Sequence, residues 1–289
     1  MPTTPGSTSV SRWAPHFALP PLLRLLGVAL NLGLGLLPTA AFFIWIERNA
    51  ALPILPIQLH WPWIALGRSL PDRQLLVASI TFDFFLILAF GFFHTLLAQR
   101  KAVLVLERVI PPQLIRTVYV AVSGITVLGV MGYWQHTGIT LWNLSLPSNL
   151  SRMVLSFALY WGLMLISLKQ ASRFGLLSFI GLTHLYSYAK DVGVPAGNPK
   201  LITEGLFAWV RHPVYSVTLL AFVLTPFMTL DRMIVFLASF AYLSVAIPIE
   251  EKKLVALFGQ SYVDYQKRVS AVLPVKRLLG AQNVASSRD

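Results

Sequence analysis

The chain has 289 residues, of which 56% are hydrophobic and only 12% are charged, and its mean hydropathy is +0.68. A soluble domain of this size carries about twice that share of charged residues. The apolar residues also come in long blocks, so the composition excludes a soluble globular protein and indicates a polytopic membrane protein. The chain has no cysteine, which excludes disulfide bonds and thiolate metal sites.

The chain divides into a hydrophobic centre and two polar ends. Residues 1–19 are rich in Pro, Ser and Thr and form a polar lead-in, which lacks the basic start and the small-residue cleavage site of a signal peptide. A first transmembrane helix and an external linker are predicted over residues 20–73, and the membrane core over residues 74–275. Residues 276–289 are predicted to be a disordered tail.

Six apolar stretches are long enough to cross about 30 Å of hydrocarbon at about 1.5 Å per residue. In chain order they are residues 20–46, 74–98, 114–134, 150–168, 213–230 and 232–250, and only the three residues around Asp231 form a turn between the last two. The stretch 174–188 is too short to span and is predicted to form a half-helix or an interfacial element. The predicted fold is therefore an all-α polytopic membrane bundle of about six transmembrane helices plus one partial or interfacial helix.

The formal net charge of +12 is distributed unevenly along these predicted elements. With a cytoplasmic N-terminus and six alternating spans, 18 of the 23 Lys and Arg residues fall in the cytoplasmic segments 1–24, 99–116, 169–212 and 252–289. The other side keeps Arg48, Arg68, Arg73, Arg152 and Arg232. This positive-inside pattern predicts that both termini are cytoplasmic. The basic excess indicates a lipid bilayer with anionic head groups as its partner, and the absence of a basic aromatic module argues against nucleic-acid binding.

Missing motifs exclude several kinds of chemistry. The six histidines are too scattered for the HxxxH or HxxHH spacing of a membrane di-iron centre, so no metal is expected. They are His16, His60, His94, His136, His184 and His212. The sequence has no GxSxG elbow, no GxxxxGKS/T loop and no strand-led GxGxxG turn. Any cofactor must therefore be held among the helices and the cytoplasmic segments.

Two charged motifs are predicted to meet at one membrane interface. Arg211 and His212 precede a proline that suits the first turn of a helix, and Glu250 and Glu251 stand at the end of the last span. Two helices of nearly equal length joined by a short turn bring their far ends to the same depth, so these residues and Tyr215 face one another. Ionisable groups at the edge of lipid are costly unless paired, which makes the cluster a candidate site. A clamp that only fastens the helical hairpin is an equally good interpretation.

Three further polar residues are candidates on their own. Asp83 and His94 lie eleven residues apart, which leaves them about 20° apart around a helix and three turns apart in height. Asp83 stands in the middle of an apolar span, where it acts either in catalysis or in an interhelical hydrogen bond. His94 lies nearer the cytoplasmic end and either deprotonates a substrate or bonds a backbone carbonyl. His184, on the partial element, either covers a cofactor or lies at the interface.

The two charged motifs also carry a resemblance. "GLFAWVRHPVY", followed by "EEKKLVALFGQSYVDYQKRV", resembles the integral-membrane methyltransferases, which include isoprenylcysteine carboxyl methyltransferases and phospholipid N-methyltransferases. The shared signature is Arg-His-Pro-x-Tyr, a Glu-Glu pair and then Phe-Gly-x-x-Tyr-x-x-Tyr, and it covers residues 205–274. The resemblance implies a pocket for S-adenosylmethionine without a Rossmann domain. It implies that the pocket is lined by Arg211, His212, Tyr215, Glu250 and Glu251.

A finer resemblance extends over residues 75–275. "FDFFLILAFGFFHTLLAQRKA", "LIRTVYVAVSGITVL" and "LLAFVLTPFMT" are similar to the bacterial methanethiol S-methyltransferase branch. The resemblance implies a thiol such as methanethiol as the acceptor, and a bacterial inner membrane with the cofactor site facing the cytoplasm. A thiol with a pKa of about 8.5 needs only one nearby histidine as a base, which points to His94, with Asp83 on the same helix face. A phospholipid amine, a prenylated carboxylate and a nurim-like structural role are the alternatives.

Overall fold

The computed structural model describes residues 18–51, 73–186 and 200–276. Their helices are, in chain order, α1 (Pro21–Leu30), η1 (Asn31–Leu36), α2 (Leu37–Ala51), α3 (Arg73–Leu97), α4 (Arg100–Leu106), α5 (Pro112–Tyr133), α6 (Asn149–Ser172), α7 (Leu176–Phe179), η2 (Thr183–Leu185), η3 (Gly205–Ala208), α8 (Pro213–Val223), α9 (Leu230–Phe258) and α10 (Gln260–Arg268). Two short strands, β1 (Thr140–Asn143) and β2 (Phe227–Thr229), pair antiparallel. Nearly all of the expected polar lead-in and disordered tail lies outside the described residues, as does most of the external linker.

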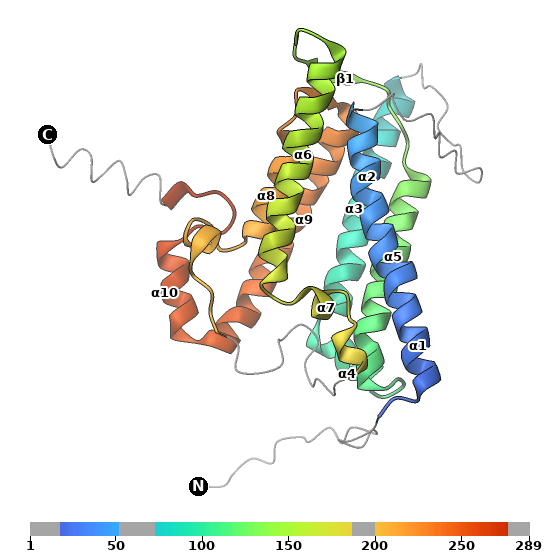
Figure 1. The fold of residues 1–289 in the computed structure, drawn as a ribbon, viewed down its shortest axis with the longest axis vertical. Coiled ribbons are helices and arrows are strands. Elements are labelled where there is room, and N and C mark those ends of the chain that lie inside the picture. The colour runs from blue at the N-terminus through green and yellow to red at the C-terminus, as the bar shows by residue number, and fades with distance from the viewer. Residues whose placement is uncertain (1–17, 52–72, 187–199, 277–289) are drawn as a thin grey trace, which may run out of the picture.

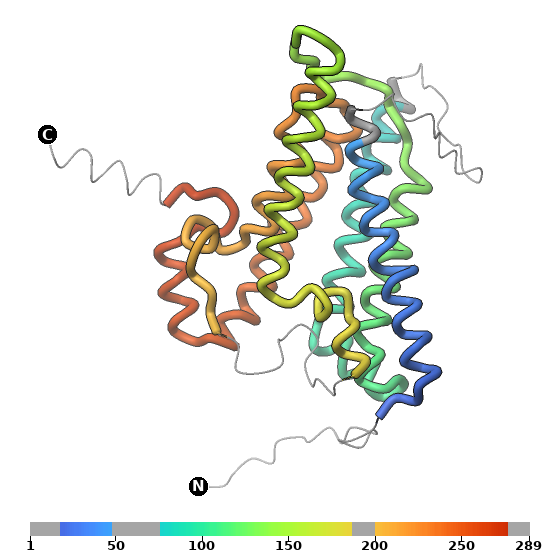
Figure 2. The backbone as a smooth tube through the Cα atoms, viewed as in Figure 1, coloured from blue at the N-terminus to red at the C-terminus, as the bar shows by residue number. Residues whose placement is uncertain are grey.

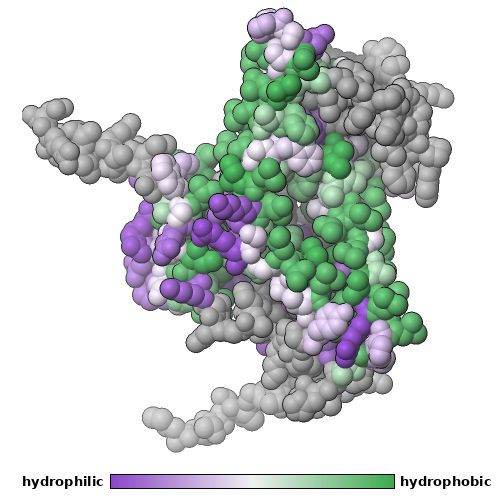
Figure 3. All heavy atoms as spheres, viewed as in Figure 1, coloured by the Kyte–Doolittle hydropathy of each residue, from purple (hydrophilic) through white to green (hydrophobic). Residues whose placement is uncertain are grey.

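The long helices lie side by side along the long axis of the molecule (Figure 1). α3 packs against both α5 and α9, and α6 packs against α8. The consecutive helices α1, η1 and α2 form one rod against α5, as the tube in Figure 2 shows. α10 lies beside the lower half of the bundle and is joined to α9 at Gly259, whose φ of +58° suits a glycine. Hydrophobic side chains cover the long helices, whereas hydrophilic ones gather over α10 (Figure 3).

In the part of the chain that the structure describes, five helical rods are long and apolar enough to cross a membrane. They are Pro21–Glu47, Leu76–Leu97, Pro112–Tyr133, Asn149–Ser172 and Leu230–Phe258. The protein is therefore an all-α polytopic membrane protein, as its composition predicted. The stretch 174–188 was expected to be too short to span, and its described part forms only α7 and η2.

The expected fifth span, residues 213–230, is wrong in length. α8 has only 11 residues, which is roughly 16 Å of helix and half of a hydrocarbon core. Pro226 stops the helix because proline lacks the N–H of the next turn and disfavours helical geometry at Thr225. The chain then runs extended through β2, and Thr229 caps α9 by accepting a hydrogen bond from the N–H of Arg232 at 3.2 Å. The expected turn around Asp231 is therefore the first turn of α9.

Arg232 does not face water beside the membrane but is buried at the end of the bundle opposite to α10. Its Nη1 lies 3.6 Å from Oε2 of Glu47, and its Nε donates to the carbonyl of Phe222 at 2.8 Å. Its guanidinium also stands over the ring of Tyr160, 5.1 Å from the centroid. Arg232 of α9 thus contacts residues of α2, α6 and α8 and connects the four helices.

Close packing of the first rod on α5 depends on Gly124. A Cβ added there would lie 1.4 Å from the carbonyl oxygen of Leu34 in η1, a position set by backbone and not by a movable side chain. A Cβ at Gly129, one and a half turns further along the same helix, would meet nothing within 4 Å. The two glycines therefore form a matched pair for testing this contact.

We expect Gly124→Ala to destabilise the protein by about 1–3 kcal/mol, because the first rod must move away from α5. Gly129→Ala should leave the melting temperature (Tm) unchanged or raise it, since alanine favours helix by up to about 1 kcal/mol. Thermal unfolding of the two variants in detergent measures the difference. Equal melting temperatures would show that the packing of the first rod on α5 does not require the close contact at Gly124.

Candidate active site

Backbone pairing fixes the segment that carries Arg211 and His212. The N–H of Arg211 donates to the carbonyl of Ser270 at 2.8 Å, and that of His212 donates to Ala271 at 3.0 Å. The hydroxyl of Ser216 donates to the carbonyl of Val272 at 2.8 Å. The chain that follows α10 therefore lies against the start of α8, and both form one side of the site.

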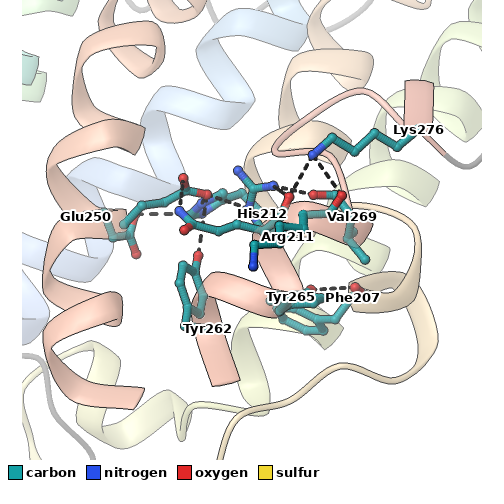
Figure 4. A network of polar contacts seen from close by, with 11 residues as sticks. Phe207, Arg211, His212, Glu250, Tyr262, Tyr265, Val269 and Lys276 are labelled. Carbon is teal, nitrogen blue, oxygen red and sulfur yellow. Dashed lines mark hydrogen bonds and ion pairs between the residues drawn. The ribbon is translucent and has the colours of Figure 1, made fainter. Parts of the chain in front are cut away.

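Arg211 and Glu251 form the centre of a buried polar network. Figure 4 shows this network around Arg211. The Nε of Arg211 donates to Oε1 of Glu251 at 2.6 Å, and its Nη1 donates to the carbonyls of Gln266, at 3.2 Å, and Val269. Glu251 also accepts from Nε2 of Gln266 at 2.8 Å. The two charged side chains are only 9% and 12% exposed. Arg211 is thus held on several sides, which is the geometry of a clamp between α9 and the C-terminal segment.

Glu250, in contrast, keeps an accessible carboxylate. Its side chain is 43% exposed, and its Oε2 accepts a hydrogen bond from the hydroxyl of Tyr215 at 2.9 Å. His212 stands between the two glutamates, with Nδ1 3.9 Å from Oε2 of Glu250 and Nε2 3.1 Å from Oε1 of Glu251. The rings of His212 and Tyr215 are stacked, with centroids 5.5 Å apart. The five residues predicted to meet do meet. Glu251 completes a clamp, whereas Glu250 keeps an exposed carboxylate, and the role of the cluster as a site stays a prediction.

Two tyrosines of α10 lie beside this network and donate hydrogen bonds from their hydroxyl groups. The hydroxyl of Tyr262 donates to Oε1 of Glu251 at 3.4 Å, and that of Tyr265 donates to the carbonyl of Phe207. Burial raises the pKa of Tyr262, as does nearby Glu251. Burial raises the pKa of Tyr265 to about 12. Both tyrosines therefore keep their protons at neutral pH and act as donors.

His94 belongs to a second cluster, formed between α3 and α5. Its Nε2 lies 2.6 Å from the hydroxyl of Tyr119, and its Nδ1 lies 3.1 Å from the hydroxyl of Ser123. The guanidinium of Arg116 lies over the ring of Tyr119, 4.5 Å from its centroid. These three partners were not among the residues predicted from the sequence. Their spacing along α5, at positions 116, 119 and 123, places three polar groups on one face of an apolar helix and was the available signal.

His184 lies next to this second cluster. It is buried on η2, and Arg116 donates from Nη2 to the carbonyl of Phe179 at 2.6 Å, which fastens the preceding turn of chain onto α5. Burial lowers the pKa of His184, and the charge of Arg116 lowers it further. The imidazole is therefore neutral at neutral pH. The predicted position over the site is consistent with this placement, but its predicted role as a cofactor cover stays a prediction.

Electrostatic interactions connect the two clusters. Glu250 interacts electrostatically with Tyr119 and with Tyr242, and the hydroxyl of Tyr242 lies 3.0 Å from that of Thr95, the neighbour of His94. The accessible carboxylate of one cluster is thus near the histidine and tyrosine of the other. The two clusters together hold the negative charge of Glu250, the rings of Tyr119, Tyr215 and Tyr242, and the imidazole of His94. These groups suit the binding of a cation next to a proton acceptor.

Asp83 lies in neither cluster. It is fully buried, and its Oδ1 accepts a hydrogen bond from the backbone N–H of Gln135 at 2.9 Å. It also interacts electrostatically with Asp231 in the first turn of α9, and Glu250 lies roughly 29 Å further along that helix. Asp83 and His94 share one helix, but about 17 Å of rise separates them. The hydrogen bond therefore joins α3 to the backbone just after α5 and not, as one of the two interpretations of Asp83 had it, to another helix. The catalytic interpretation stays a prediction.

Comparisons with known proteins were consistent with these features. Residues 163–256 match the model of the isoprenylcysteine carboxyl methyltransferase family. A methanethiol S-methyltransferase of Crocosphaera subtropica is 30% identical over 216 residues, which cover 73% of this chain and 82% of the relative. One from Pseudomonas deceptionensis is 31% identical over 208 residues, covering 71% and 77%. Nurim of Rattus norvegicus is 28% identical over 201 residues, covering 68% and 75%.

No solved structure gave a significant match. Among the described residues, no group of three or more His, Asp or Glu side chains is placed to hold a metal ion.

Proposed function

The chain belongs to the family of integral-membrane methyltransferases that includes the methanethiol S-methyltransferases, and from this premise we propose that it methylates a small thiol, with methanethiol as the best candidate and S-adenosylmethionine as the methyl donor. The observation that carries the proposal is the accessible carboxylate of Glu250, which interacts electrostatically with Tyr119, the hydrogen-bonding partner of His94. These residues combine a group that attracts a cation with a group that accepts a proton.

The residues present suit S-adenosylmethionine, which supplies a methyl group on a positively charged sulfur that becomes neutral as the methyl leaves. Glu250 is the accessible acid that pairs with the amino group. The stacked rings of His212 and Tyr215, with Tyr119 and Tyr242 nearby, offer aromatic faces to a cation.

Arg211 and Glu251 frame this pocket, and His184, on η2, is proposed to cover it. The structure commits Arg211 to Glu251 and to backbone carbonyls. We therefore assign it to holding the C-terminal segment in place, which shapes the pocket, and not to direct contact with the cofactor's carboxylate.

His94 is the proposed final acceptor of the thiol proton, because a neutral imidazole can accept a proton. The site lies at the end of the bundle that the charge distribution places in the cytoplasm. A charged cofactor then enters from the cytoplasm, and a lipophilic thiol enters from the bilayer. The bacterial inner membrane is the proposed location.

The test is a methyl-transfer assay on detergent-purified protein with radiolabelled S-adenosylmethionine and separate acceptors. Methanethiol is expected to give dimethyl sulfide, measured in the headspace by gas chromatography. Phosphatidylethanolamine and a prenylated cysteine test the other acceptor classes, which the match to the isoprenylcysteine carboxyl methyltransferase family makes worth including. Methylation of either acceptor without dimethyl sulfide would replace the thiol proposal. Folded protein that methylates none of the three would favour a nurim-like role.

The two interpretations of Asp83 give opposite results in the same assay. We expect Asp83→Asn to keep methyl transfer and S-adenosylmethionine binding unchanged, because the amide oxygen still accepts from the N–H of Gln135. A variant that binds the cofactor normally but no longer transfers methyl groups would instead give Asp83 the catalytic role.

A further inference from the structure

Both ring nitrogens of His94 are occupied by neighbouring hydroxyl groups. Tyr119 lies 2.6 Å from Nε2, and Ser123 lies 3.1 Å from Nδ1. The ring of His94 is also flanked by Phe90, at 5.4 Å between centroids, and by Tyr119 itself, at 4.9 Å. In this arrangement a thiol has no free imidazole nitrogen to reach, unless one of the hydroxyl groups moves away.

Tyr119 is the member of this cluster that interacts with the residues around Glu250. It interacts electrostatically with Glu250, Tyr242 and Tyr215, and Tyr215 itself donates a hydrogen bond to Glu250 at 2.9 Å. Arg116 lies over its ring and carries a permanent positive charge. A cation against the phenol stabilises negative charge that develops on the phenol oxygen during a proton transfer.

We propose that Tyr119 is the residue that takes the proton from the acceptor thiol, and that His94 takes the hydroxyl proton of Tyr119 in the same step. This inference rests on the proposed thiol methylation and deepens it, because it names the group that touches the substrate. His94 is then the final proton acceptor but has no contact with the sulfur. The relay uses the tautomer in which Nδ1 donates to the oxygen of Ser123 and Nε2 accepts from Tyr119, and the serine hydroxyl is able to accept that hydrogen bond.

The proton balance follows directly from these contacts. The S–H bond of the thiol breaks, and its proton bonds to the oxygen of Tyr119 while the former O–H proton bonds to Nε2 of His94. The thiol sulfur uses its released electron pair to bond the methyl carbon, and the donor sulfur keeps the pair of the bond that breaks. His94 is left as an imidazolium and returns its proton to solvent after the thioether leaves.

The variant that tests this relay is Tyr119→Phe, which keeps the ring against Arg116 and removes only the hydroxyl. At pH 7 we expect methanethiol methylation to fall by about 100-fold, the lower range for loss of general acid–base catalysis. The rate of the variant should then rise about tenfold per pH unit below the pKa of the thiol, because each unit raises the thiolate fraction tenfold. The wild-type rate should depend much less on pH over the same range.

Two controls separate this role from a structural one. S-adenosylmethionine binding, measured by calorimetry, should be the same in Tyr119→Phe and wild type, since the hydroxyl acts on the acceptor. Tyr133→Phe removes a hydroxyl from the exposed end of the same helix and should change neither binding nor rate.

Three outcomes would overturn the proposal. A full rate for Tyr119→Phe at pH 7 would show that the hydroxyl takes no part. A loss that higher pH does not restore would mean that Tyr119 only supports the packing of the site. Wild-type protein that binds S-adenosylmethionine but methylates no thiol at any pH would remove the proposed function itself, and the relay with it.

Discussion

Glu250→Gln is expected to weaken S-adenosylmethionine binding by about 100-fold or more, because loss of one partner of a desolvated charge pair costs about 2–5 kcal/mol. The substitution removes the charge but keeps a side-chain oxygen that can accept the hydrogen bond from Tyr215. The fold should therefore survive, with a change in Tm of only about 2 °C, as for other partly exposed positions. Calorimetry and thermal unfolding on the same preparation measure both effects.

The matched control for this variant is Asp264→Asn on α10. Asp264 is also a carboxylate near the C-terminal segment, but it pairs with the exposed side chains of Lys267 and Gln260 and lies outside the Arg211–Glu251 network. Its neutralisation changes the net charge of the protein by the same amount and should leave the affinity unchanged. Equal weakening in both variants would mean that overall charge attracts the cofactor, and equal affinity in both would remove Glu250 from the pocket.

The sequence predicted that the Glu-Glu pair lies at the site, but it did not show which glutamate pairs with Arg211 and which one stays accessible. Adjacent residues on a helix point about 100° apart, so only one of them can face a given neighbour. Which one faces Arg211 depends on where α10 and the chain after it return to the bundle, and this is a tertiary contact. The carboxylate left over, that of Glu250, is the accessible one.

The fold could be predicted wherever hydrophobicity alone decides it. The long apolar helices follow from blocks of apolar residues longer than a bilayer needs. The length of α8 did not follow, because the residues around Pro226 are as apolar as a span, and only proline geometry ends the helix. The pairing of β1 with β2 joins segments nearly ninety residues apart, and no local pattern specifies it.

The site, like the fold, could be predicted where a sequence motif specifies it but not where tertiary contacts do. The Arg-His-Pro motif is specific enough to be recognised, and its predicted partners are in contact. Tyr119 lies in an apolar span, where tyrosine is also a common packing residue, so its importance depends on the facing residue, His94. Asp83 was correctly placed on the same helix face as His94, but a shared face does not give shared contacts when three turns separate two residues.

The second large effect is expected for Arg211→Met, which should destabilise the protein by about 3–5 kcal/mol because it leaves the carboxylate of Glu251 buried without its cation. For a chain of this size the fall in Tm is on the order of 10 °C. Hydrogen exchange should become faster over residues 260–276, because the side chain of Arg211 also binds the carbonyls of Gln266 and Val269. The control, Lys267→Met, removes an exposed cation from α10 and should change neither the Tm nor the rate of hydrogen exchange.

Two further variants of the Arg211–Glu251 pair show whether the pair stabilises the protein through its charges alone or also through the hydrogen-bond geometry of the guanidinium. Arg211→Lys keeps the charge, but one ammonium group cannot reach a carboxylate and two carbonyls in the directions that a guanidinium serves, so the loss of stability should remain. Arg211→Met combined with Glu251→Leu should recover part of the Tm, since removing both charges abolishes the uncompensated carboxylate. If Arg211→Lys melts like the wild type, the clamp depends on charge alone. If the double variant is less stable than Arg211→Met, Glu251 stabilises the C-terminal segment through Gln266 and Tyr262 more than through Arg211.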